Sequence, residues 1–130
     1  MAEAKVSIKP NAAFKSLVDA RAELTASKKF LATKDYEGMK DFLSDSSLNI
    51  NNYEENASVL LASKQLDAES KKEIGTIRRY GVGADVIIMY GGVKAELEEE
   101  ETNFSTLSKS LQRAMDSLDE VIAICKSNGF

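Results

Sequence analysis

Apolar residues recur along the chain at intervals of three and four, which is the spacing of one face of an α-helix. The first such pattern predicts a helix over residues 11–33, with one stripe directed at the core. A second pattern follows Asp35, a residue suited to cap a helix N-terminus, and it stops in the polar stretch 44–47. The N-terminal third of the chain is therefore predicted to form two helices.

The second helix is predicted to be interrupted and then to restart. We expect Leu48 and Ile50 to hold the interruption against the core. Asn52 and Glu55 have the spacing of a capping box, in which the two side chains satisfy backbone N–H groups at a helix start. Apolar residues resume after Asn52, so the second helix should continue there.

A third helix is predicted to be long and unbroken, with Asp67 as its cap and its end near residue 97. Small and large residues alternate at three-and-four spacing along one face, which we expect to point inward. That face consists of Ile74, Ile77, Gly81, Ala84, Ile88, Gly91 and Ala95. The alternative is a strand over residues 84–90, because three β-branched residues lie there between glycines. Gly91 and Gly92 could mark a kink.

A fourth helix carries the cleanest stripe. Thr102 and Asn103 can cap it, and Asn128 with Gly129 can end it in a left-handed turn. Its apolar positions are Phe104, Leu107, Leu111, Ala114, Met115, Leu118, Val121, Ile122 and Cys125. Four amphipathic segments with short connections predict an all-α, up-down-up-down four-helix bundle, formed as one domain over residues 1–130.

Composition and charge argue against several functions. The net charge is −4, from 17 basic and 21 acidic residues, so no global positive field draws in nucleic acid or an anionic membrane. The chain has no histidine, which removes the commonest general base and transition-metal ligand. Its one cysteine, Cys125, lies on an apolar stripe and is expected to be buried rather than reactive. We therefore expect a protein that is not an enzyme and holds no cofactor.

No apolar run approaches the roughly 20 residues that a membrane span requires. The first residues, 1–5, lack the apolar centre of a secretory signal and the character of a transit peptide. We expect them to be an expression start placed on a mature chain. We also expect the isolated chain to be a monomer.

Three short motifs suggest chemistry, and each has a structural alternative. The run from Gly81 to Val86 begins like a dinucleotide-binding fingerprint, but its sixth position is not Gly or Ala. The run 116–119 copies the attachment motif of acyl carrier proteins, with Ser117 as the modified residue, although Ser117 lies inside the predicted fourth helix. The acidic cluster at residues 96 and 98–101 could bind calcium weakly but lacks the spacing of a calcium loop. Packing or solvation is the favoured interpretation of all three.

Basic side chains are the candidate partner-binding groups. They are Arg78, Arg79, Lys71, Lys72, Lys28, Lys29 and Lys34. The two arginines are adjacent, and a guanidinium can make two parallel hydrogen bonds to a carboxylate, which an ammonium group cannot. We expect them to clamp carboxylates of a partner and to matter more than the lysines. The alternative is that all seven are ordinary solvated charges.

The segment 67–97, with its run Ile-Gly-Thr-Ile-Arg-Arg-Tyr-Gly-Val-Gly-Ala-Asp-Val-Ile-Ile-Met-Tyr-Gly-Gly, resembles the lumenal extrinsic photosystem II proteins of diatoms. The ending 117–130 resembles them too, and the likeness extends more loosely over the whole chain. That group is similar in fold to the PsbQ group, which are four-helix bundles that dock on photosystem II.

The resemblance implies a location in the chloroplast thylakoid lumen, peripheral to the membrane. It implies partners in the photosystem II core and among the other extrinsic subunits. The expected function is to support the oxygen-evolving manganese cluster, and the retention of chloride and calcium, without ligating the cluster. A helical adaptor in some other assembly, and the acyl carrier-like domain, are the alternatives.

Overall fold

The computed structural model describes residues 8–75 and 80–130, and no strand occurs within them. The helices of this described part are α1 (Pro10–Ala32), α2 (Tyr36–Leu43), the 3-10 turn η1 (Asn49–Asn52), α3 (Tyr53–Ala62), α4 (Ala68–Ile74), α5 (Val82–Leu97) and α6 (Phe104–Ser127). The all-helical prediction is confirmed, and the segment 84–90 is helix rather than strand. None of the described helices combines the length and apolar character needed to cross a membrane.

Three acidic or amide side chains begin helices where the sequence predicted them. Asp35 accepts a hydrogen bond from the Gly38 N–H at 2.9 Å at the start of α2. Asp67 accepts from the Ser70 N–H at 2.7 Å at the start of α4. Asn103 accepts from the Thr106 N–H at 2.9 Å at the start of α6. Each satisfies an N–H group that the helix itself leaves unpaired.

The interruption of the second helix is confirmed, but the capping box is not. The Asn52 side chain makes no cap hydrogen bond. Its amide instead donates to the backbone oxygens of Ser46 at 3.0 Å and Leu48 at 2.9 Å. The amide is therefore used to close the preceding loop, which brings Ile50 into the core with 2% of its surface exposed.

The predicted long third helix is wrong, because glycines break it. Gly75 ends α4 with φ of 75°, and Gly81 precedes α5 with φ of 137°. Both values lie in the region that side chains with a Cβ rarely adopt. A Cβ on Gly75 would also collide with the carbonyl oxygen of Tyr80. The helix is thus broken between α4 and α5, whereas α5 continues through Gly91 and Gly92 to Leu97.

The inward face predicted for this helix is also wrong for its second half, and Ile77 of that face lies outside the described residues. Ile88 is 60% exposed, and Gly91 and Ala95 are exposed as well. The residues buried along this part of α5 are Val86, Tyr90, Val93 and Leu97. This second set has the same three-and-four spacing but larger side chains, so turning it inward removes more apolar surface from water. Because α5 is separated from α4, it can rotate about its own axis so that these larger side chains face the core.

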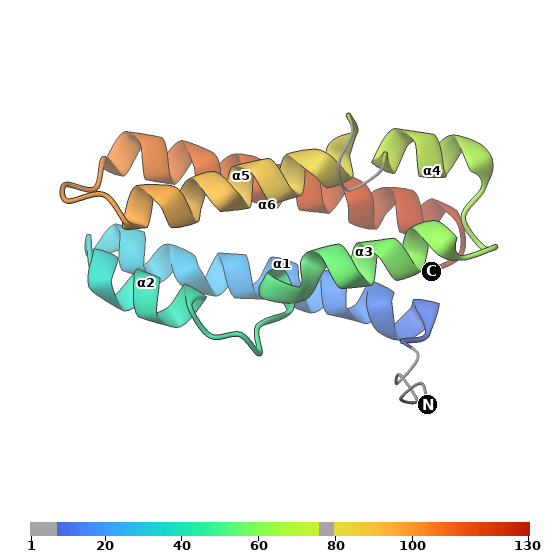
Figure 1. Ribbon diagram of the computed structural model, residues 1–130, viewed down its shortest axis with the longest axis horizontal. Coiled ribbons are helices and arrows are strands. Elements are labelled where there is room, and N and C mark those ends of the chain that lie inside the picture. The colour runs from blue at the N-terminus through green and yellow to red at the C-terminus, as the bar shows by residue number, and fades with distance from the viewer. Residues whose placement is uncertain (1–7, 76–79) are drawn as a thin grey trace, which may run out of the picture.

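The helices pack around one hydrophobic core. Figure 1 shows α5 lying along α6 and α1 lying along α3, with α4 at one end of the molecule and α2 at the other. Large residues at the centre are 1% exposed or less, among them Leu17, Leu24, Leu107, Leu111 and Leu118. Each such side chain contributes roughly 1.5–3 kcal/mol through burial. The Arg21 guanidinium on α1 donates two hydrogen bonds to the Asp119 carboxylate on α6, at 2.7 and 3.2 Å, and so joins the two helices.

Candidate functional site

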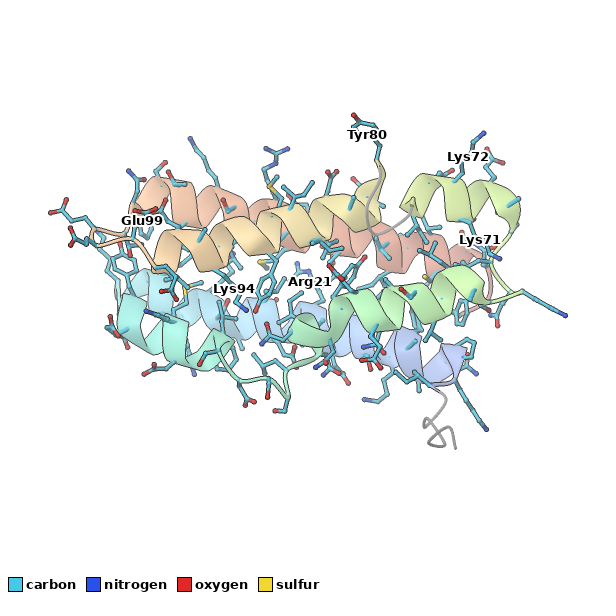
Figure 2. The ribbon with its side chains drawn as sticks, viewed as in Figure 1. Arg21, Lys71, Lys72, Tyr80, Lys94 and Glu99 are labelled. Atoms are coloured by element: carbon cyan, nitrogen blue, oxygen red, sulfur yellow. The ribbon has the colours of Figure 1, made fainter. Side chains whose placement is uncertain are left out.

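The basic residues predicted to bind a partner fall into separate groups. Lys28 and Lys29 lie near the end of α1, and Lys34 lies in the turn to α2. Lys71 and Lys72 lie in the last turn of α4, at the opposite end of the molecule (Figure 2). The predicted residues Arg78 and Arg79 lie outside the described residues. The five described lysines therefore do not form one surface.

The lysines at the end of α1 are partly engaged by aromatic rings. The Lys29 Nζ lies 5.1 Å from the centre of the Phe30 ring. The Lys34 Nζ lies 5.4 Å from the centre of the Phe104 ring, which links the α1–α2 turn to the start of α6. Such contacts stabilise a cation by about 0.5–1 kcal/mol at exposed sites. Lys28 is the exposed lysine of this group without such a contact.

Acidic residues surround Lys34, so the surface around the α1–α2 turn carries negative as well as positive charge. Lys34 shares a shallow depression of about 300 Å³ with Asp35, Glu37, Glu99 and Glu100. The surface here is of mixed sign rather than basic. A partner that meets it would need groups of both signs. The same holds for Lys71 and Lys72, because the exposed carboxylates of Asp67, Glu69 and Glu73 lie on or beside the same helix.

The acidic cluster after α5 is used within the fold. Glu96 accepts a hydrogen bond from the Asn103 N–H at 3.0 Å, and Glu98 pairs with Lys40 at 3.3 Å. Among the described residues, no group of three or more acidic or cysteine side chains is arranged to hold a metal ion. These carboxylates fix the turn between α5 and α6 and connect it to α2.

The two remaining motifs lie within helices. Gly81 stands at the start of α5 without a strand before it in the described chain, so the dinucleotide-binding unit is not formed. Ser117 lies in the interior of α6, half-buried beside the fully buried Leu118. An attachment serine needs an accessible position at a helix start, which this one lacks. Neither motif gains support from the structure.

A groove between η1, the start of α3 and α5 was missed from the sequence. It has a volume of about 380 Å³ and is lined by apolar side chains such as Ile50, Val86 and Ile87. Polar groups from separate segments meet at its edge. They are Asn51 from η1, Glu54 and Glu55 from α3, and Tyr90 and Lys94 from α5.

A small hydrogen-bond network holds the groove together. The Tyr90 hydroxyl donates to Asn51 Oδ1 at 2.6 Å, and the Lys94 ammonium reaches the same oxygen at 3.5 Å. The Asn51 amide in turn donates to the Leu43 carbonyl at 2.9 Å and the Asp45 carbonyl at 2.7 Å. Figure 2 shows Lys94 extending from α5 toward this side of the molecule. Asn51 is thus the residue that connects α2, η1 and α5.

Glu23 of α1 anchors the other side of η1. Its carboxylate accepts hydrogen bonds from the Asn49 N–H at 3.0 Å, the Asn49 side-chain amide at 2.9 Å and the Ile50 N–H at 2.9 Å. Burial, and then the nearby charge of Glu23, raise the pKa of Tyr90. Tyr90 is therefore a neutral hydrogen-bond donor at physiological pH.

Two further groups in the core are also held neutral. Burial, and then the proximity of Cys125, raise the pKa of Tyr53. Burial raises the pKa of Cys125 to about 11, so its thiol is protonated and lies in the core as the sequence predicted. The Tyr53 hydroxyl has no hydrogen-bond partner among the described residues. These groups form a packed interior rather than an activated nucleophile.

Comparison with known proteins adds no relative, since no protein-family model, curated protein or solved structure matches this chain.

Proposed function

We propose that this chain is a non-catalytic extrinsic subunit of photosystem II. It lies in the chloroplast thylakoid lumen, peripheral on the lumenal face of the membrane. There it docks on the photosystem core and on other extrinsic subunits. Docking stabilises the oxygen-evolving complex and supports the retention of chloride and calcium, because a protein that binds one state of an assembly stabilises that state.

In this proposal the helices form an up-down-up-down bundle of the PsbQ type. The first arm is α1, the second is α2 with η1 and α3, the third is α4 with α5, and the fourth is α6. The course of the chain from blue to red in Figure 1 supports this grouping, since α3, α5 and α6 each reverse the direction of the arm before. The interruption within the second arm is part of the resemblance.

The observation that carries the proposal is the glycine pattern of residues 75–83. This pattern lies in the segment that most specifically resembles the diatom proteins, and it performs a defined task. Gly75 ends α4 and Gly81 precedes α5, each with a positive φ, and a Cβ on Gly83 would lie 2.9 Å from the carbonyl oxygen of Ile74. A sequence feature that dictates how two helices join is a stronger basis for resemblance than surface composition.

Docking is proposed to use the basic residues against acidic loops on the lumenal face. Lys71 and Lys72 are adjacent in the last turn of α4 and, unlike Lys29 and Lys34, make no contact with an aromatic ring among the described residues. Arg78 and Arg79, which lie outside the described residues, remain the groups predicted to clamp carboxylates of a partner. Binding through these groups should weaken as the salt concentration rises.

The test is reconstitution of oxygen evolution. Photosystem II particles washed free of extrinsic proteins should regain activity when the chain is added. Reversing the charge of Arg78 and Arg79 to Glu should reduce the recovery at a given concentration. The matched control reverses Lys109 and Arg113, which are exposed in the first half of α6, away from the end of α6 that bonds to α4 through Asn128. Failure of the parent chain to restore any activity would overturn the proposal, and equal losses in both variants would overturn the assigned surface.

A further inference from the structure

Helix α5 carries two apolar stripes on different sides. The stripe formed by Val86, Tyr90, Val93 and Leu97 is buried in the core. The stripe formed by Ile88, Gly91 and Ala95 is exposed, and the Ile88 side chain is among the large apolar side chains that the described chain leaves in water. A helix that is apolar on more than one side is normally covered on each of them. The second stripe lacks such a cover among residues 8–75 and 80–130.

The exposed stripe has a protruding residue and a notch. Ile88 is the protruding residue, with 60% of its surface exposed. Gly91 forms the notch, because a Cβ added there would meet nothing within 4 Å, whereas one on Gly92 would lie 3.3 Å from the Ser110 hydroxyl. Glycine weakens an exposed helix, and no contact with the described part of the chain requires one at position 91. Gly91 also lines the groove between η1, α3 and α5, together with Ile87 and Lys94.

We propose that this face of α5 binds the same face of a second copy of the chain, with the two α5 helices antiparallel. A two-fold axis between positions 88 and 91 places Ile88 of each copy over Gly91 of the other. Ala95, one turn further along, allows the helices to approach closely. The contact is isologous, since the same patch is used on both copies and the pair closes on itself.

Charges along the groove favour this arrangement. Lys94 makes no ion pair with any described residue; its ammonium reaches the Asn51 side-chain oxygen at 3.5 Å and lies 5.5 Å from the centre of the Tyr90 ring. Glu54 and Glu55 are exposed at the same groove and also form no ion pair within residues 8–75 and 80–130. The two-fold axis brings the groove side of one copy against the groove side of the other. Lys94 of each copy then faces carboxylates of its partner, so the surface is complementary to itself.

The stripe covers one face of one helix, so the contact belongs to the smaller class of interfaces and the dimer should dissociate on dilution. This inference revises the expectation that the isolated chain is a monomer. It does not rest on docking to photosystem II, because the residues involved differ from the basic groups assigned to that role.

The experiment is sedimentation velocity of the full chain over a range of concentrations. The parent chain should shift from monomer to dimer as its concentration rises. Ile88→Asp should weaken the dimer by about tenfold or more, because it places an unpaired charge in the contact. Gly91→Leu should do the same by filling the notch. Val18→Asp, an equivalent change at a half-exposed position of α1, is the control and should leave association unchanged.

Gly91→Ala separates association from folding. It should raise the thermal midpoint of the monomer, because alanine favours helix, and yet weaken the dimer. Mixing Ile88→Cys chains with Gly91→Cys chains should give more disulfide-linked dimer than mixing Ile88→Cys with Val18→Cys chains. A chain that remains monomeric at all concentrations would overturn the proposal. So would a dimer that is insensitive to the changes at Ile88 and Gly91.

Discussion

The Tyr53 hydroxyl offers a sharp test of the described core. Tyr53 is 4% exposed, and its hydroxyl has no hydrogen-bond partner in the described chain. A buried, unsatisfied hydroxyl costs about 1–3 kcal/mol in lost hydration. Replacing it by hydrogen leaves an oxygen-sized void of ~10 Å³, which costs only about 0.2 kcal/mol at about 24 cal/mol per Å³. Tyr53→Phe is therefore expected to stabilise the fold by about 1 kcal/mol or more.

Tyr90→Phe is the matched control because the same atom is removed from a satisfied site. The Tyr90 hydroxyl donates to Asn51 Oδ1 at 2.6 Å, so its loss should destabilise the fold by about 1 kcal/mol. Tyr53→Phe should thus raise the free energy of unfolding, whereas Tyr90→Phe should lower it. Urea unfolding followed by circular dichroism measures the free energies, and each 1 kcal/mol corresponds to a shift in thermal midpoint of roughly 3–5 °C at this size. If Tyr53→Phe destabilised the fold as much as Tyr90→Phe, the assignment of an unsatisfied hydroxyl would be refuted.

The remaining predictions concern glycine, a core leucine and the buried thiol. Gly75→Ala should destabilise the fold by about 2 kcal/mol or more, because the φ of Gly75 is positive and a Cβ would collide with the Tyr80 carbonyl oxygen. Urea unfolding measures the loss. An unchanged midpoint would contradict the backbone conformation assigned to Gly75. Leu118→Ala should cost about 2–5 kcal/mol in the same assay, and a loss below about 1 kcal/mol would place Leu118 outside the core. Burial raises the pKa of Cys125 from its ordinary 9.0 to about 11. The unfolded thiol ionises first, so stability should fall as pH rises from about 9 to about 11, and Cys125→Ala should show a smaller fall, measured as unfolding free energy against pH.

Most helix ends were predictable from the sequence because their causes are local. Asp35, Asp67 and Asn103 each cap a helix through a residue three positions ahead, and this relation is visible in the sequence itself. Asn52 shows the limit of such reasoning. Its amide had a local use as a cap but instead bonds carbonyls in the preceding loop, which a spacing rule cannot anticipate.

The phase of α5 could not be predicted from periodicity. Two stripes with identical spacing exist on this helix, and the choice between them depends on which side chains the neighbouring helices can bury. A helix that continued from Ile74 would turn the stripe of Ile88, Gly91 and Ala95 inward. Gly75 and Gly81 interrupt the helix, so α5 buries its other stripe instead. Comparing side-chain volumes would have favoured Tyr90 and Leu97 over Gly91 and Ala95.

The candidate site was predictable only in kind. Lys28, Lys29, Lys34 and Lys72 are exposed as the sequence predicted, whereas Lys71 is half-buried. The division of these lysines between two ends of the molecule depends on the fold. The groove at Asn51 unites segments more than 30 residues apart, and no local motif announces it. The asparagines of η1 were the available signal, since several amides in one turn need partners elsewhere.

The most direct test of the central claim is a binding isotherm of the labelled chain on salt-washed photosystem II particles. The account predicts saturable binding at a fixed ratio of chain to photosystem, release as salt concentration rises, and weaker binding when Lys71, Lys72, Arg78 and Arg79 are reversed in charge. Binding that is absent at low salt, or that never saturates, would contradict it.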